Sequence, residues 1–229
     1  YYISSQANVS RFDPTTGVTE DIIGSSTAGF AGDGGPASEA SLNMFNNGAV
    51  AIAPNGDIFI ADFVNHRVRR VYPNQLGVLE IETIAGTGNT NFLDKKGPAL
   101  EANLEYPSRL VSDKRGNLYL VDGAVKFGRG RLRLLKRQDD GTFDIQTIFG
   151  GNNDQNIDCG SGIIEKNIEE TQVTTALSAS LSSICSGPIL DIAINDQCET
   201  KKRLKIVIAQ EFEYDSPSST LVSISQPCE

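Results

Sequence analysis

The sequence predicts an all-β protein, and three observations support that prediction. Short apolar runs recur along the chain and are separated by turns such as Asn55-Gly56 and Arg115-Gly116. This pattern is typical of antiparallel hairpins, because a tight turn needs a residue with positive φ. The composition is rich in turn formers, with 22 glycines and 9 prolines among 229 residues. No long segment has a convincing helical period, and only residues 163–181 are a candidate for a short helix.

The predicted strands form copies of one unit. They span 49–53, 58–62 and 67–72 in the first copy, 109–113, 118–122 and 131–136 in the second, and 189–194, 206–210 and 220–225 in the third. A fourth strand carries a Thr-Ile-x-Gly type of element, centred on Ile23, Ile84 and Ile148 at intervals of 61 and 64 residues. Four short antiparallel strands per unit, repeated at a period of about 60, are typical of the blade of a β-propeller.

This strand pattern predicts a single propeller domain or segment over residues 1–229, with about four blades. The predicted blades span about 1–24, 48–85, 107–149 and 187–225, and an insertion occupies 151–186. The first blade would lack its innermost strand and the last its outermost, so both ends would leave open sheet edges. We therefore expect either that the rest of the propeller lies outside this sequence or that another chain completes the sheet. A four-bladed ring closed by the first and last sheets is a further alternative.

Four sequence elements occur in an order that resembles the NHL repeat family. They are the Gly-Phe-Ala-Gly-Asp-Gly-Gly-Pro-Ala run at 29–37 and the segments 55–62, 65–71 and 83–86. The second copy is similar, the third diverges, and residues 1–13 resemble the back half of a blade. The resemblance, in particular to the extracellular, teneurin-like type of NHL repeat, implies a β-propeller, commonly of six blades, that serves as a binding platform.

Composition and charge restrict the classes of partner. The chain has 20 Lys and Arg against 29 Asp and Glu, a formal net charge of −9, whereas nucleic-acid binders normally carry a basic excess. The one histidine cannot build a histidine-rich metal site, and no apolar run approaches the roughly 20 residues that span a bilayer. No signal peptide is visible and the chain starts at Tyr1, so we expect a processed chain or a piece of a longer one.

The cysteines and one sequon indicate secretion. Cys159, Cys185, Cys198 and Cys228 contain no Cys-x-x-Cys pair. Their even number favours two disulfides in an oxidising compartment over four buried thiols in a cytosolic protein. Of the three possible pairings, the predicted layout favours Cys159 with Cys185, which closes the insertion, and Cys198 with Cys228, at one end of the last blade. The sequon at Asn8 predicts a glycosylation site.

A basic stretch over residues 126–137 has two interpretations. Arg131 and Arg133 alternate with leucines and share one strand face. Together with Arg129, they form either a basic stripe for an acidic partner, such as RNA, a sulfated glycan or a neighbouring subunit, or the solvated face of an outer strand. The acidic total argues against nucleic acid as the general partner.

A second group of polar residues surrounds the strand ends. Asp62 and Asn65 precede Arg67 and Arg69 in the sequence, and they form either a polar binding patch or, as we favour for a repeated motif, a set of hydrogen bonds and ion pairs that locks strands within a blade. The alternative function is a calcium-dependent propeller hydrolase of lactones or esters, with Asp62, Asn65 and Asp122 as candidate ligands.

The expected function is that of a secreted, non-enzymatic structural or adhesion protein that needs no cofactor. Its blades would present loops to other protein chains, to copies of itself or to glycans. In a sharper version, exposed end strands pair between chains and build a polymer or filament, because an open edge accepts an added strand.

Overall fold

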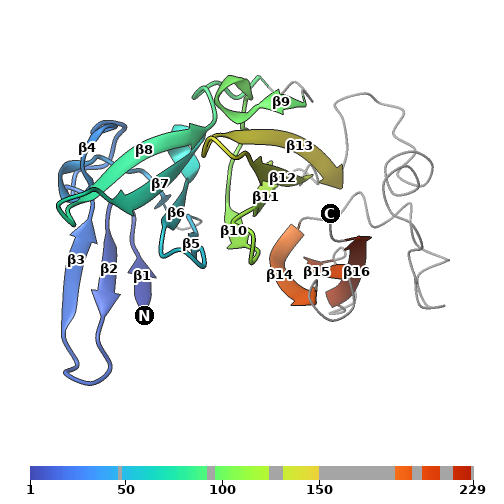
Figure 1. Ribbon diagram of the computed structural model, residues 1–229, viewed down its shortest axis with the longest axis horizontal. Helices are drawn as coiled ribbons and strands as arrows, with labels where there is room; N and C mark the ends of the chain where they lie inside the picture. The colour runs from blue at the N-terminus through green and yellow to red at the C-terminus, as the bar shows by residue number, and fades with distance from the viewer. Residues whose placement is uncertain are drawn as a thin grey trace.

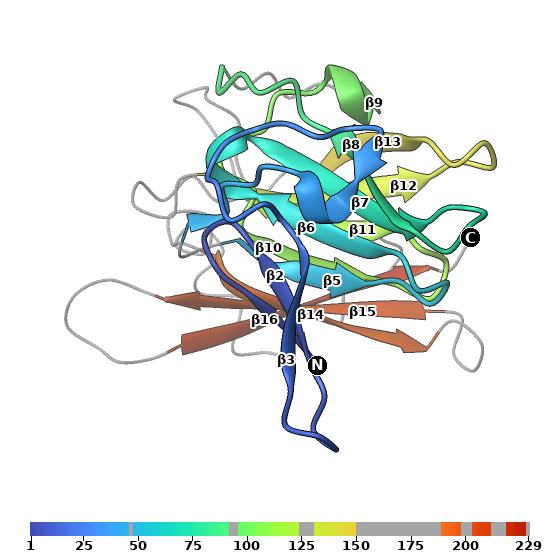
Figure 2. The same cartoon turned by 90° about the vertical axis from the view of Figure 1, so that its left-hand side faces the viewer.

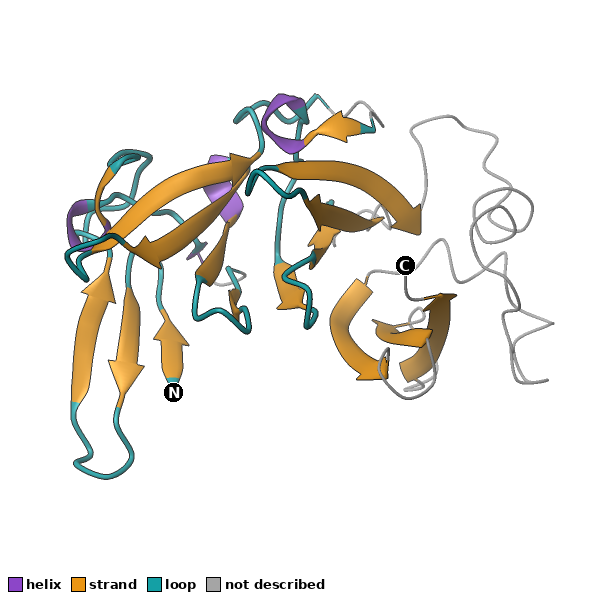
Figure 3. Cartoon of the chain, viewed as in Figure 1, coloured by secondary structure: helices purple, strands orange, loops and turns teal. Residues whose placement is uncertain are grey.

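The computed structural model describes residues 1–45, 48–91, 96–123, 131–149, 189–197, 203–211 and 219–227 (Figure 1). These residues form four antiparallel sheets, so the all-β prediction is confirmed. Among the described residues, helical structure is limited to short 3₁₀ segments (Figure 3). Within the same part of the chain, no helix has the length and apolar character needed to cross a membrane.

The first two sheets lie before residue 90. The first sheet has the order β1-β2-β3, with β1 at Tyr2–Ser4, β2 at Val9–Phe12 and β3 at Thr19–Ile23. The second sheet has the order β4-β8-β7-β6-β5. Its strands are β4 (Gly35–Pro36), β5 (Val50–Ile52), β6 (Ile58–Asp62), β7 (Arg67–Pro73) and β8 (Leu79–Ala85).

The third and fourth sheets follow. The third sheet has the order β10-β11-β12-β13-β9, made of β9 (Gly97–Pro98), β10 (Arg109–Ser112), β11 (Leu118–Asp122), β12 (Arg131–Arg137) and β13 (Phe143–Phe149). The fourth sheet has the order β14-β15-β16, made of β14 (Ile189–Gln197), β15 (Arg203–Glu211) and β16 (Ser219–Pro227). The 3₁₀ segments η1 (Ala37–Glu39), η3 (Phe63–Asn65) and η4 (Ala99–Glu101) lie between strands.

The four sheets lie next to one another in an arc (Figures 1 and 2). Strand β10 contacts both β5 and β14, so one edge strand from each of three sheets lies along the inner side of the arc (Figure 1). The described sheets do not close into a ring, and the count of four propeller blades therefore stays a prediction. The predicted insertion at 151–186 and the predicted helix at 163–181 lie outside the described residues.

Two apolar layers hold the first three sheets together. In the first layer, Ile58 and Ile60 of β6 pack with Val9 and Ile23 of the first sheet. In the second, Phe59 belongs to the cluster that includes core residues of the third sheet. Because successive residues of a strand point to opposite faces, β6 has both faces covered. This explains why its sequence is a continuous apolar run rather than an alternating one.

The same bulge occurs in the first three sheets and corrects the alignment of the repeats. It lies between Val9 and Ser10, between Val68 and Arg69, and between Leu132 and Arg133. On the partner strand the ladder passes over Ile22, Ile84 and Ile148. Ile22, and not Ile23, is therefore the counterpart of Ile84 and Ile148.

Two short edge strands were not predicted. Gly35 and Pro36 of β4 pair with Ile81 and Glu80 of β8, and Gly97 and Pro98 of β9 pair in the same way with β13. A proline is tolerated there because an edge strand leaves one side of its backbone unpaired. These segments cover the outer edges of the second and third sheets, which would otherwise be open.

The two ends of the strands differ in their connections. Tight turns join β5 to β6 and β10 to β11, with Gly56 at φ +90° and Gly116 at φ +81°, as the hairpin signals predict. The β7–β8 and β12–β13 turns lie at this same end and project to the right in Figure 2. The opposite end, here called the loop end, carries the long connections from β3 to β5 and from β8 to β10, and also η3.

Candidate binding surface at the loop end

A buried ion pair organises the loop end of the second sheet. Asp62, the last residue of β6, accepts hydrogen bonds from the Asn43 backbone N at 2.7 Å and from Asn65 Nδ2 at 2.8 Å. Arg69 Nη1 lies 3.3 Å from Asp62 Oδ2, and both side chains are fully buried. A second carboxylate, Asp33, also pairs with Arg69 through Nη2 at 2.5 Å. These contacts are the strand-locking hydrogen bonds and ion pairs that the repeated motif predicts for Asp62, Asn65 and Arg69.

Burial and hydrogen bonding act in opposite directions on this carboxylate. Loss of solvent raises the pKa of Asp62 above its ordinary value, whereas the hydrogen bonds from Asn65 and Asn43 and the charge of Arg69 act to lower it. Desolvation is the largest of these effects. The carboxylate therefore serves as a structural partner whose charge is costly to bury and depends on its donors.

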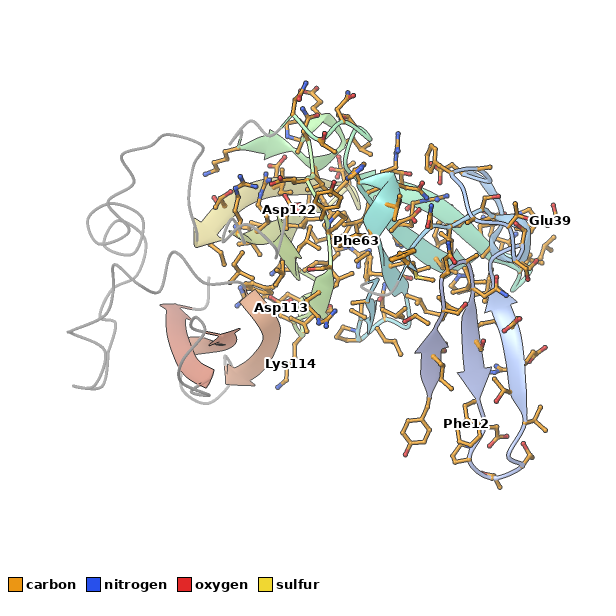
Figure 4. All side chains as sticks on the ribbon, turned by 180° about the vertical axis from the view of Figure 1, so that it is seen from behind. Phe12, Glu39, Phe63, Asp113, Lys114 and Asp122 are labelled. Atoms are coloured by element: carbon orange, nitrogen blue, oxygen red, sulfur yellow. The ribbon has the colours of Figure 1, made fainter. Side chains whose placement is uncertain are left out.

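The third sheet contains the equivalent pair. Asp122 accepts hydrogen bonds from the backbone N of Glu105 at 2.8 Å and of Tyr106 at 3.0 Å, and Arg133 Nη1 lies 3.4 Å from its Oδ2. Burial raises the pKa of Asp122, while Arg133, these backbone donors and Arg131 act against the shift. Figure 4 shows Asp122 on the third sheet and Phe63 near its junction with the second.

The predicted basic stripe is not formed by its two described members. Arg131 is 1% exposed and Arg133 is 0% exposed. Arg131 pairs with Glu105 at 3.3 Å and Arg133 with Asp122, so both guanidinium groups point to carboxylates inside the protein rather than to solvent or a partner. The two do share a face, but that face is covered. Arg129 lies outside the described residues.

The proposed calcium ligands do not converge. Asp62 and Asn65 are hydrogen bonded, whereas Asp122 lies in the next sheet. Each of the two carboxylates already contacts an arginine, and a guanidinium at that distance repels a metal cation. Over the described ranges, no group of three or more His, Cys, Asp or Glu could hold a metal ion. The calcium-dependent hydrolase gains no support from this geometry.

The glycosylation sequon lies at the junction of β2, β3 and the following loop. Asn8 Nδ2 donates to Asp21 Oδ2 at 2.9 Å and to Ser26 Oγ at 3.0 Å, and Asn8 Oδ1 accepts from the Ser26 backbone N at 2.9 Å. The amide that a glycan would occupy is thus engaged in the fold, and its glycosylation stays a prediction. All four cysteines lie outside the described residues, so their pairing also stays a prediction.

An aromatic cluster joins the second and third sheets at the loop end. The Phe63 and Tyr106 ring centroids are 5.1 Å apart, and those of His66 and Tyr106 are also 5.1 Å apart. His66 Nδ1 lies 2.5 Å from the Glu105 carbonyl oxygen, so the chain's histidine also links the two sheets. His66 has φ +55°, a left-handed conformation that turns the backbone from η3 into β7.

Three exposed apolar side chains lie on segments that are hydrogen bonded to η3 or belong to it. Phe30 is 44% exposed, Phe45 53% and Val64 38%. Hydrogen bonds bring their segments together, because Asn65 Nδ2 donates to the Gly29 carbonyl and Val64 N donates to the Asn43 carbonyl. We call this surface the η3 patch, made of Phe30, Phe45, Phe63, Val64, His66, Arg67 and Tyr106.

Most of the η3 patch was not predicted from the sequence. Phe63 and His66 contact Tyr106, which lies about forty positions further along the chain, and local periodicity does not report such contacts. One signal was available. Phe63 and Val64 directly follow the strand that ends at Asp62, where a solvent-facing turn would normally be polar.

Comparisons with known proteins agree with a propeller-like fold. Residues 48–71 match the NHL repeat, a segment that includes β5, β6, η3 and most of β7. This match supports the NHL-repeat resemblance, whereas the teneurin-like type stays a prediction. No match was found among curated protein sequences.

Two solved structures from Bacteroides thetaiotaomicron are similar to this chain. One, described as a structural genomics protein of unknown function, has 20% identity and a TM-score of 0.55, covering 90% of this chain and 40% of that chain. The other, described as an auxiliary nutrient binding protein, has 17% identity and a TM-score of 0.44, covering 65% of this chain and 33% of that chain. This chain thus spans less than half the length of either protein, and at 20% identity the first likeness shows the fold alone.

Proposed function

We propose that this chain is a non-enzymatic protein-interaction scaffold that binds its partner through the η3 patch. The observation that carries the proposal is the patch itself, in which Phe30, Phe45 and Val64 expose apolar surface on segments that adjoin the packed rings of Phe63 and Tyr106. Exposed aromatic surface on a rigid base is typical of protein-binding sites. The NHL repeat match, which includes η3, supports an interaction role.

In this proposal the scaffold acts outside the cell. The four cysteines and the sequon at Asn8 support that location, since disulfides persist in oxidising compartments. Adhesion through the η3 patch and self-assembly through open edges are separate modes. For the second, β1 pairs with β2 alone among the described strands, and Ile3 in this strand is 52% exposed.

A capture experiment tests the η3 patch. Val64→Glu places a charge in the patch at a position exposed enough to leave the fold unchanged. The matched control is Leu76→Glu, because Leu76 is 88% exposed in the β7–β8 turn at the opposite end of the strands. We expect quantitative capture from extracellular extracts to fall about tenfold or more for Val64→Glu, as when a charge is left unpaired in an interface, and to stay unchanged for Leu76→Glu.

Equal capture by both variants would contradict the proposal. Circular dichroism and thermal unfolding of the two variants confirm that any difference arises at the surface. Sedimentation velocity of the wild-type chain addresses self-assembly separately, since a monomer across the concentration range would exclude assembly through the β1 edge while leaving the η3 patch as the binding surface.

A further inference from the structure

Strand register shows that Arg67 and Arg131 occupy the same position in successive sheets. Arg67 is the cross-strand partner of Asp62, and Arg131 is the cross-strand partner of Asp122. The next arginines along each strand also correspond, since each locks onto the same Asp: Arg69 onto Asp62 and Arg133 onto Asp122. The two sheets can therefore be compared residue by residue.

The residue that faces the first arginine differs between the sheets. In the third sheet the Glu105 backbone N donates to Asp122, and the Glu105 side chain binds Arg131 at 3.3 Å. In the second sheet the backbone N that donates to Asp62 belongs to Asn43. Asn43 thus occupies the position of Glu105, and the carboxylate that neutralises Arg131 has no counterpart beside Arg67.

Arg67 is held in place without a carboxylate. Its Nη1 donates to the Asn65 carbonyl at 2.8 Å, its Nη2 donates to the Thr87 carbonyl at 2.9 Å, and its guanidinium carbon lies 3.8 Å from the centre of the Phe30 ring. These contacts use two of the five donor hydrogens of the guanidinium. Within the described part of the chain, no Asp or Glu forms an ion pair with Arg67.

Asn43 is a second sign that this polar set is incomplete. Its side-chain Oδ1 is buried and has no hydrogen-bond partner among the described residues. Buried polar atoms are usually paired, and an exception calls for an explanation. Arg67 therefore lacks the carboxylate that Arg131 has, and the residue in the position of Glu105 carries a buried amide oxygen that accepts no hydrogen bond from the described residues.

We propose that Arg67 anchors a carboxylate of an acidic segment of the partner protein. This inference rests on the proposed function, because it names the partner chemistry of the same η3 patch. The partner's carboxylate takes the role that Glu105 has for Arg131, and the exposed Phe30 and Val64 contact an apolar side chain beside it. A guanidinium held over an aromatic ring, with donor hydrogens still unused, is suited to bind a carboxylate through two hydrogen bonds.

Peptide selection tests this chemistry without knowledge of the natural partner. The full chain, immobilised, selects from a displayed library of random heptapeptides, and the best sequence is made as a free peptide. We expect Asp or Glu to be enriched at one position beside an apolar residue. We expect Arg67→Gln to weaken binding of that peptide about tenfold or more, the range of a charge-assisted hydrogen bond. Arg11→Gln is the control, because Arg11 is an exposed arginine on the first sheet and its loss should change nothing.

A second variant keeps Arg67 in place, so the inference can be tested even if Arg67→Gln does not fold. Asn43→Glu supplies an internal carboxylate where Glu105 stands in the third sheet, so it should occupy Arg67 and weaken acidic peptides to a similar extent. Asn43→Gln adds the same length without the charge and should bind like the wild type. Thermal unfolding of all four variants identifies any that lose the fold.

Several outcomes would overturn the inference. One such outcome is a set of selected peptides without an Asp or Glu preference that bind Arg67→Gln as tightly as the wild type. If Val64→Glu still weakens their binding, the η3 patch remains the binding surface and Arg67 has no role in it. Displacement of the peptide by sodium glucuronate but not by sodium acetate would assign the site to an acidic glycan instead. A wild-type chain that enriches no sequence also overturns the inference, and the capture experiment then decides the proposed function by itself.

Discussion

The second and third sheets contain a buried Asp–Arg ion pair at the same register, but the other arginine of each strand has different partners in the two sheets. Arg131 is buried against Glu105, whereas Arg67 lies over the exposed Phe30 and bonds to backbone carbonyls. The difference follows from one position, Asn43 in one sheet and Glu105 in the other. A repeat can therefore keep its internal lock and still change the chemistry of its surface by one side chain.

The first sheet extends the comparison. It shares the bulge of the other two, and by register Ser10 stands where Arg69 stands in the second sheet. Ser10 Oγ donates to Asp21 Oδ1 at 2.5 Å, and Asp21 lies on β3 at the register of Thr83 rather than at the strand end that supplies Asp62. The contact is thus an ion pair where the side chains are buried and a hydroxyl–carboxylate hydrogen bond where they are exposed.

The largest expected effect breaks the charged lock. Asp62→Ala leaves Arg69 with one carboxylate and the Asn43 backbone N without its acceptor, so we expect a loss of about 3–5 kcal/mol in the free energy of unfolding. Urea unfolding monitored by circular dichroism measures it. Ser10→Ala removes the exposed hydroxyl–carboxylate hydrogen bond of the first sheet and should cost about 1 kcal/mol or less. Similar losses in the free energy of unfolding for the two variants would show that the buried ion pair contributes no more than the exposed hydrogen bond.

An intermediate effect is expected at the position that separates the second and third sheets. Glu105→Gln removes the carboxylate of the almost fully buried Arg131, and we expect a loss of about 2 kcal/mol. Asn43→Gln is the control, because Asn43 makes no ion pair and its backbone N still donates to Asp62. A midpoint of thermal unfolding that is unchanged in Glu105→Gln would show that Arg131 does not depend on Glu105.

A smaller effect is expected from pH. The pKa of Asp122 is raised above 3.8 in the folded chain, mainly by burial. The folded state therefore binds this proton more tightly than the unfolded chain does. The resulting stabilisation is fully present below 3.8 and is lost as pH rises through the folded pKa. The stability of wild type relative to Asp122→Asn, measured by urea unfolding across the acidic range, should fall as pH rises, and a rise would contradict the assigned direction.

The smallest effect is expected at the exposed ion pair of the first sheet. Arg11 and Glu20 lie 2.9 Å apart, but their side chains are 58% and 60% exposed. Water and salt screen such a pair, so Arg11→Gln should change the free energy of unfolding by no more than about 0.5 kcal/mol. A loss comparable to that of Asp62→Ala would show that exposure does not separate the two kinds of pair.

The sequence was sufficient for elements whose signal is local. The strand Ile58–Asp62 and its turn at Gly56 follow from an apolar run and a residue that tolerates positive φ. The two-residue strands β4 and β9 did not follow, because two residues have no period and their pairing depends on a strand more than forty positions away.

The sequence also did not predict whether a given strand face is exposed to solvent or buried. Alternation correctly places Arg131 and Arg133 on one side of their strand, but it does not say whether that side meets solvent or carboxylates. The same limit applied to the η3 patch, whose contacts join Phe63 to Tyr106 across two sheets. Long-range neighbours, rather than residue type, decide both cases.

The pairing of Gly35 and Pro36 with β8 has a mechanical consequence. The connection from the first sheet to the second contains β4, which is hydrogen bonded to the outer strand β8. Gly97 and Pro98 pair with β13 of the third sheet in the same way. Tension applied at Tyr1 that peels away the first sheet must also strip β4 from β8, and so weakens the next unit before it is reached. Under tension, unfolding of one sheet should therefore destabilise the next sheet, and the sheets should not unfold as independent units.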